Sequence, residues 1–332
     1  MMHSPDRRAL LARLAAAAAA VTVPAGRLFA QPAPAWPSKR ISIVVPFTPG
    51  GGVDTVARTL GDRLAAQIGQ TVLIDNKPGA SANIGTDAVA KAAPDGYTLL
   101  VAANGLATNM VLFAHMPFDT MKDLAPISLI GNAPLVLVTA TESPYKSLQQ
   151  LVAAGRADPK AITYGSAGNG SSGHLASALL GSVAKFESLH VAYKGGSPAL
   201  VDLIAGRISY MLLNPLEVLP HVKSGRLKAL AVSGAHRIPL LPDVPTMAEA
   251  GLPGFEAGVW WAFMAPGGTP QPIIERLNAE TRKALADPKA AQQLESLGAT
   301  ITPSSPAELS RFLQGEITKW GKVIKDNNIQ PE

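Results

Sequence analysis

The segment ISIVVPFTPGGGVD, residues 41–54, decides the fold of this chain. It begins with a short apolar run rich in β-branched residues, which Pro46 and Pro49 stop just before three glycines at positions 50–52. From Val53 to Ile68, apolar residues recur at helical spacing. A buried strand therefore turns through glycines into a helix, and the unpaired N–H groups at the start of that helix suit an anion. Because the turn contains no lysine or arginine, backbone and hydroxyl groups would have to hold the anion.

Length and composition bound the class of protein. The chain has 332 residues, enough for about two domains. Hydrophobic residues make up 47% of the chain and charged residues 16%, so a packed core is expected and disorder is not. Cysteine is absent, which excludes disulfides, thiolate metal sites and cysteine nucleophiles.

Residues 1–30 have the pattern of a cleaved signal peptide. Arg7, Arg8 and Arg13 form a charged region, residues 10–23 form an alanine-rich apolar stretch, and cleavage is expected near Ala30. The arginine pair leaves both Sec and twin-arginine export open. A membrane anchor fits less well, because the apolar stretch is shorter than the ~20 residues that span a bilayer. We therefore expect the mature protein in the periplasm.

The signal segment also accounts for most of the positive charge. The formal net charge is +5, and residues 1–30 hold four arginines and one aspartate, so the mature chain lies near +2. Its lysines and arginines are scattered along the sequence. No nucleic-acid partner is expected from this distribution.

The opening pattern of strand, glycine loop and helix occurs twice. After the first unit, the sequence predicts strands over 71–75 and 97–102 around a helix over 83–92, which is typical of a parallel sheet with right-handed crossovers. Short strands over 127–130 and 135–139 and a helix over 147–155 follow. The second unit has a strand over 162–164, a Gly/Ser loop over 165–173 and a helix over 175–183. Further strands are expected over 189–193, 208–213, 227–232 and 256–264, with helices over 198–205 and 217–222 and two amphipathic helices at the end.

Motifs for catalysis or cofactors are weak. Residues 168–173 match G-x-G-x-x-G, but the acid of a dinucleotide site could only be Glu187, and an exported protein has poor access to NAD. Ser166 lacks the preceding glycine of a nucleophile elbow, since Tyr164 occupies that position. The glycines at 50–52 lack a P-loop lysine, and the histidines lack metal-ligand spacing. We expect no catalysis, no cofactor and no metal.

Two helix starts that suit anions, with many hydroxyl groups around them, favour a solute receptor. Such a receptor would hold one end of an anionic ligand with each lobe and exclude water as the lobes close. His174 begins the helix after the second glycine loop, and we count it among the residues that could face the cleft.

Several segments resemble the Bug family, the extracytoplasmic solute receptors of tripartite tricarboxylate transporters. The likeness runs in order through essentially the whole mature chain. It rests on residues 46–54 (PFTPGGGVD), 76–80 (NKPGA), 83–85 (NIG), 93–97 (APDGY), 164–170 (YGSAGNG), 190–195 (HVAYKG), 241–246 (LPDVPT) and 248–251 (AEAG).

The resemblance implies an α/β fold of the type II periplasmic-binding-protein class, with two lobes joined by crossing strands and a ligand cleft between them. One lobe would combine residues 37–133 with 250–332, and the other would cover 134–249. The jaws of the cleft would be the first loop, residues 47–55, and the second loop, residues 166–174, with bridging waters helping to hold a carboxylate. The expected ligand-binding residues are Phe47, Thr48, Gly50, Gly51, Gly52, Asp54, Thr55, Asn104, Thr108, Ser166, Gly168, Asn169, Ser171, Ser172, His174 and Asn214.

Two positions refine this expectation. Asp54 would be repelled by a ligand carboxylate, so we expect it to order its turn by accepting backbone N–H bonds. Leu213 stands beside Asn214, where family members often carry an acid that could pair with a ligand amine. Its presence favours an unsubstituted or aromatic carboxylate over an amino acid, unless residue 213 simply faces the core.

The resemblance implies a receptor that delivers a small carboxylate, such as a di- or tricarboxylate or an aromatic acid, to inner-membrane permease subunits. We expect the receptor to be a monomer. A periplasmic sensor that reports to the kinase of a two-component system would use the same pocket and stays open. An NAD-dependent oxidoreductase is the less favoured alternative.

Overall fold

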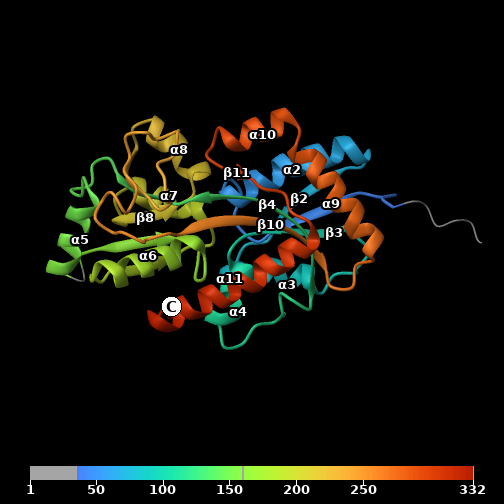
Figure 1. Cartoon of the computed structure of the whole chain (residues 1–332), viewed down its shortest axis with the longest axis horizontal. Coiled ribbons are helices and arrows are strands. Elements are labelled where there is room, and N and C mark those ends of the chain that lie inside the picture. Colours follow the sequence, from blue (N-terminus) through green and yellow to red (C-terminus); the bar gives the residue numbers. More distant parts are fainter. Residues whose placement is uncertain (1–35, 159–160, 332) are drawn as a thin grey trace, which may run out of the picture. The chain divides into compact units, whose positions relative to one another are not determined.

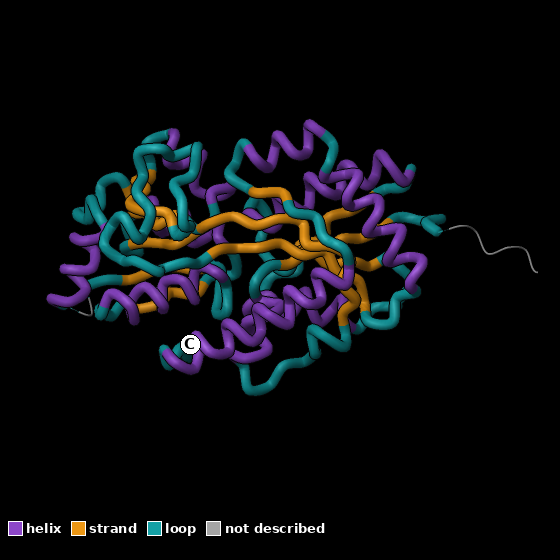
Figure 2. The backbone as a smooth tube through the Cα atoms, in the orientation of Figure 1, coloured by secondary structure: helices purple, strands orange, loops and turns teal. Residues whose placement is uncertain are grey.

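A computed structural model describes residues 36–158 and 161–331, and the predicted signal peptide lies outside them. From Pro37 onward the chain forms one compact unit that holds two β-sheets. Helices lie on both sides of the strands in Figures 1 and 2. This arrangement confirms the predicted α/β class.

The first sheet contains the strand of the opening segment, which lies between two other strands near one edge. Strand β1 pairs in parallel with β2 and β3, as the alternation of strands and helices predicted. Ile41, Ile43, Val44 and Val45 are at most 2% exposed, because helices cover both faces of the sheet. In order across the sheet, the strands are β11 (Thr300–Ile301), β4 (Leu124–Pro134), β10 (Gly258–Pro266), β3 (Thr98–Ala102), β1 (Ile41–Val45) and β2 (Val72–Asn76).

Two groups of helices cover the first sheet. Helix α2 packs against α9 and α10 on one side, and α4 packs against α11 on the other, with α3 nearby (Figure 1). The predicted apolar stripe of α11 is buried at Leu309, Leu313 and Trp320, which confirms that it packs into the core. The helices are α2 (Gly52–Ile68), α3 (Asn83–Ala90), α4 (Gly105–Leu112), α9 (Gln271–Leu285), α10 (Pro288–Glu295) and α11 (Pro306–Asp326), with a 3₁₀ turn η1 (Ala80–Ala82).

The second sheet contains the second strand–loop–helix unit. Strand β6 pairs in parallel with β7 and β8, and β5 pairs antiparallel with β8 and β9. The strand order is β7 (Leu189–Ala192), β6 (Thr163–Ser166), β8 (Tyr210–Leu213), β5 (Val136–Ala140) and β9 (Leu227–Val232). The helices around it are α5 (Leu148–Ala157), α6 (Ser172–Ala184), α7 (Gly196–Ile204) and α8 (Pro215–Lys223).

Strands β4 and β10 carry the chain between the two sheets. They pair antiparallel along their lengths, from Leu124 opposite Pro266 to Pro134 opposite Gly258. Strand β5 of the second sheet starts at Val136, directly after β4 ends. These are the expected crossing strands, and the lobe boundaries near 133 and 249 stay a prediction.

The predicted interruption between the strands over 127–130 and 135–139 was wrong, because β4 continues through residues 131–134. Gly131 lies between Trp261 of β10 and Ile301 of β11, and a Cβ there would collide with the Thr300 carbonyl. The glycine therefore allows two strands to approach closely, and it does not bend the chain.

Helix α4 was not predicted, because Asn104-Gly105 has the composition of a turn. The structure makes Asn104 the residue before that helix. Among the described residues, no helix has both the length and the apolar character needed to cross a membrane.

Candidate functional site

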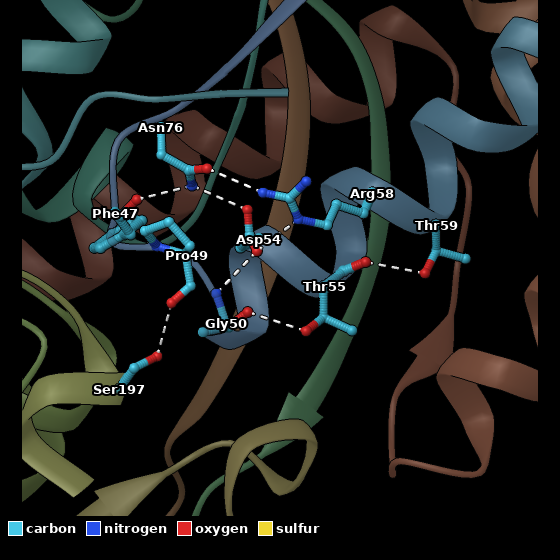
Figure 3. Close-up of polar contacts among 10 residues, drawn as sticks. Phe47, Pro49, Gly50, Asp54, Thr55, Arg58, Thr59, Asn76 and Ser197 are labelled. Carbon is cyan, nitrogen blue, oxygen red and sulfur yellow. Dashed lines mark hydrogen bonds and ion pairs between the residues drawn. The ribbon is translucent and has the colours of Figure 1, made fainter. Parts of the chain in front are cut away.

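The first loop is held in shape by Asp54 (Figure 3). Its Oδ2 accepts hydrogen bonds from the Gly50 N–H and from Arg58 Nε, both at 2.9 Å, and its Oδ1 accepts one from Asn76 Nδ2 at 2.9 Å. Asn76 also donates to the Phe47 carbonyl at 3.0 Å. Burial acts to raise the pKa of Asp54, but the hydrogen bonds from Arg58, Gly50 and Asn76 outweigh it and keep the pKa below its usual value. The ionised aspartate therefore orders the turn.

The second loop is held by neutral groups. Ser171 Oγ accepts the His174 N–H at 3.3 Å and so caps α6, while His174 Nδ1 accepts the Gly170 N–H at 3.1 Å. Ser166 Oγ lies 2.7 Å from His190 Nε2. These bonds fix the backbone of the loop without an ionised group.

A stack of buried rings lies behind the second loop. The ring centroids of Tyr164 and His190 are 4.7 Å apart, and those of His190 and His174 are 4.4 Å apart. Burial lowers the pKa of His174 to about 4. Burial, with a smaller contribution from His174, lowers the pKa of His190 to about 3. Both histidines are therefore neutral near pH 7, which agrees with Nδ1 of His174 acting as an acceptor.

Hydrogen bonds join the first-sheet part of the chain to the second-sheet part. Ser197 Oγ donates to the Pro49 carbonyl at 3.1 Å (Figure 3), and the Thr48 N–H donates to the Lys194 carbonyl at 3.4 Å. Thr108 Oγ1 donates to the Gly170 carbonyl at 2.6 Å. The residues that flank the two sheets are thus in contact across the space between the sheets.

That space is a small cavity of about 50 Å³, which is enough for a few water molecules or a compact ligand. Backbone, amide and hydroxyl groups supply most of its polar lining. Its lining residues are Phe47, Gly51, Gly52, Val53, Ser81, Ala103, Asn104, Gly105, Ala167, Asn169, Ser171, Ser172, Gly173, Gly196, Leu212, Leu213, Asn214, Glu217 and Val259.

Within the described part of the chain, five helices start at this cavity. Gly52, Gly105, Ser172 and Gly196 are the first residues of α2, α4, α6 and α7, and Asn214 precedes α8. The start of each helix presents unpaired N–H groups and the equivalent of about half a positive charge. Together they make a site for an anion that requires no lysine or arginine.

The structure brings half of the predicted binding residues to the wall of the cavity. They come from the first loop, from the end of β3, from the second loop and from the end of β8. They are Phe47, Gly51, Gly52, Asn104, Asn169, Ser171, Ser172 and Asn214.

The remaining predicted residues are not among those that line the cavity, and several of them support the residues that do. Thr55 Oγ1, for example, donates to the Gly51 carbonyl at 3.1 Å, and Thr108 Oγ1 bonds to the Asn104 and Gly170 carbonyls. This group consists of Thr48, Gly50, Asp54, Thr55, Thr108, Ser166, Gly168 and His174.

Glu217 is a lining residue that the sequence analysis missed. It lies in the first turn of α8, and its Oε1 accepts a hydrogen bond from Asn214 Nδ2 at 2.5 Å. Burial raises the pKa of Glu217, against the opposing effects of the Gly52 N–H and the Asn214 amide. Its position three residues after Asn214, at the start of a helix that follows a cleft strand, is the signal that could have found it.

Ser81 was also missed. Ala80, Ser81 and Ala82 have φ values of 43°, 57° and 74°, a run of left-handed backbone without glycine. Asn109 Nδ2 holds this turn by donating to the Ser81 carbonyl and to Asn83 Oδ1, both at 2.8 Å. Sequence patterns do not predict such a turn, because these residue types rarely adopt it.

Leu213 both lines the cavity and belongs to the apolar core of the second sheet, where it is 4% exposed. The two alternatives for this residue, a cleft position and a core position, are therefore not exclusive. Among the lining residues that the structure describes, Glu217 is the one ionisable side chain. Within the described ranges, no three His, Asp or Glu side chains gather as a metal site would require.

Comparison with known proteins places the chain in a family. Residues 56–329 match the model of the tripartite tricarboxylate transporter family receptor. The chain is 38% identical over 297 residues to protein BugT of Bordetella pertussis, with 89% of this chain and 91% of BugT covered.

Two solved structures from Rhodopseudomonas palustris are also similar. A protein determined with adipate has a TM-score of 0.86 at 36% identity, with 90% of this chain and all of the other covered. MatC with bound malate has a TM-score of 0.84 at 34% identity, with 87% of this chain and all of the other covered. The chain therefore belongs to the tripartite tricarboxylate transporter receptors of the Bug family, which are periplasmic solute-binding receptors.

Proposed function

We propose that this receptor binds a small dicarboxylate in the cavity between the two sheets and hands it to inner-membrane permease subunits. The observation that carries the proposal is the meeting of five helix starts at one cavity whose described lining has no cationic side chain. Such a site stabilises a carboxylate through fixed N–H dipoles. The similar structures with adipate and malate support a dicarboxylate as the ligand.

The proposal assigns different tasks to the two groups of predicted residues. Gly51 and Gly52 would present the start of α2 to one carboxylate, and Ser171, Ser172 and Asn169 would contact the ligand from the second sheet. Residues behind the lining, such as Asp54, would keep the loops in shape. The cavity would offer binding and shielding from water, and no group in it would act as a catalyst.

The first test is a thermal-shift screen of residues 31–332 against malate, adipate, citrate, benzoate and NAD. A ligand that binds only the folded state stabilises it by about 2.7 kcal/mol at 100 times its Kd, which gives a shift of several degrees. We expect a shift with malate or adipate. A shift with NAD alone would favour the oxidoreductase alternative and contradict the proposal.

A pair of glycine variants tests the location of the site. Gly51 has extended backbone and its Cβ position is 3.6 Å from the nearest atom, so Gly51→Val should fold and fill the cavity. We expect the Kd for malate or adipate to rise by at least about 100-fold. Gly315→Val, at an exposed position of α11 with open space around it, is the matched control. Equal Kd values for Gly51→Val and the wild type would show that the ligand binds elsewhere.

A further inference from the structure

Glu217 occupies an unusual position, because its carboxyl group reaches the starts of two helices on opposite sides of the cavity. A Cβ on Gly196, the first residue of α7, would collide with Glu217 Oε2. The same oxygen lies 3.6 Å from the Cβ position of Gly51, just before α2. The carboxyl therefore sits among the N–H groups that we assign to the ligand carboxylate.

Two acceptor atoms at this place have no hydrogen-bond partner of normal geometry among the described residues. They are Glu217 Oε2, which has essentially no exposed surface, and Oδ1 of Asn214, a residue that is 7% exposed. A buried acceptor without a donor costs about 1–3 kcal/mol. A proton on Glu217 Oε2 would turn one of these acceptors into a donor that points at a cavity occupant.

The cavity cannot easily hold two ionised carboxylates side by side. Its described lining contains no lysine, arginine or histidine to offset an ionised Glu217 beside a ligand carboxylate. Two carboxylates that share a site keep one proton between them, because like charges at close range raise the affinity for a proton. A ligand carboxylate and Glu217 would be such a pair.

We propose that Glu217 carries a proton in the liganded cavity and donates it as a hydrogen bond to a ligand carboxylate, so that affinity falls as the pH rises. This inference rests on the proposed function and adds a specificity-determining residue to it. The proton comes from solvent, and no covalent bond to the ligand forms or breaks. The raised pKa that burial gives Glu217 agrees with the inference.

Of the other charged or titratable groups near Glu217, some line a different groove and some are paired with one another. His221 and Arg226 line a groove on the outer side of Glu217. Burial, with help from Arg226, lowers the pKa of His221, so this ring is neutral above pH 7. Charged residues on the other elements near α8 are Asp54, Arg58, Asp62 and Arg63 on α2, Asp202 on α7 and Lys228 on β9. Asp54 bonds to Arg58, and Asp202 bonds to Tyr193 and Arg207.

The test is isothermal titration of malate and of adipate into the mature protein between pH 6.5 and 8.5. Binding that requires the protonated acid weakens by about tenfold per pH unit above the pKa of Glu217 in the empty protein. The wild type should therefore show a rising Kd. In Glu217→Gln the amide keeps a donor at every pH, so its Kd should change less than about twofold and be lower than that of the wild type at pH 8.5. His221→Gln should keep the wild-type slope.

The outcomes separate the inference from the proposed function. A flat wild-type Kd, or an equal slope in Glu217→Gln with a wild-type melting curve, would overturn the role of Glu217 and leave the receptor function standing. Preferential binding of aspartate that is lost in Glu217→Gln would show an ionised Glu217 paired with an ammonium group, and would also overturn it. Failure of both malate and adipate to bind at any pH would remove the proposed function and this inference together.

Discussion

The first and second loops share one plan, a buried strand that passes through glycines into a helix, but different chemistry holds them. The first loop depends on ionised Asp54 and its bonds to Gly50, Arg58 and Asn76. The second depends on neutral His174 and His190, hydrogen-bonded to loop atoms. Loops that suit an anion can therefore be held in shape with or without an ionised side chain. The two loops should lose stability under different conditions.

Low pH should produce the largest difference between the contributions of the two loops to stability. Because the pKa values of His174 and His190 are about 4 and 3 in the folded protein and about 6.5 in the unfolded chain, the unfolded chain binds more protons as the pH falls below about 6.5. Each histidine then contributes a loss of up to about 1.4 kcal/mol per pH unit. Asp54, whose pKa is lowered, keeps its contribution until the pH falls below the usual carboxyl value of 3.8.

Urea unfolding between pH 7 and 4.5 measures this effect. We expect the free energy of unfolding to fall by about 5 kcal/mol, with a smaller slope in His174→Gln and in His190→Gln. His236→Gln, at an exposed position, should keep the full slope. A free energy of unfolding that is constant down to pH 4.5 would contradict the claim that neutral His174 and His190 hold the second loop.

Glycine replacements should expose a second difference. Gly170 has φ of 73°, and a Cβ there would collide with Asn109 Oδ1, so Gly170→Ala combines backbone strain with a clash. Gly50 has φ of 81° but its nearest neighbour is Ser197 Oγ at 3.5 Å, so Gly50→Ala brings strain alone. We expect losses of about 3 and about 1 kcal/mol respectively, measured by urea unfolding. Equal losses would show that the second loop is as free to adjust as the first.

Helix capping should give the smallest difference. Ser171 caps α6, whereas α2 begins after Gly51 without a side-chain cap. Ser171→Ala should destabilise the protein by about 1 kcal/mol, and Gly51→Ser should stabilise it by a few tenths of a kcal/mol. Thermal melts of both variants without ligand measure these changes. A neutral Ser171→Ala would mean that the Gly170–His174 bond alone fixes the second loop.

Sequence patterns predicted both strand–loop–helix units, because prolines, glycines and the change of apolar period mark them locally. They could not predict β4 through Gly131, since the reason for that glycine is the close approach of Thr300, far away in the chain. The role of Glu217 is only partly local. Its spacing from Asn214 at a helix start marks it as a candidate, but its place in the cavity depends on how α8 meets the starts of α2 and α7.

The central claim is that helix starts, and no cationic side chain, hold a ligand carboxylate in the cavity. A crystal structure of the mature protein with malate or adipate, whichever gives the larger thermal shift, tests it most directly. The account predicts a carboxylate within hydrogen-bond distance of the Gly52 N–H or of the N–H groups at Ser172 and Gly196, with Glu217 next to it. A carboxylate bound by lysine or arginine, or seated outside the cavity lined by Phe47 and Asn214, would contradict the account.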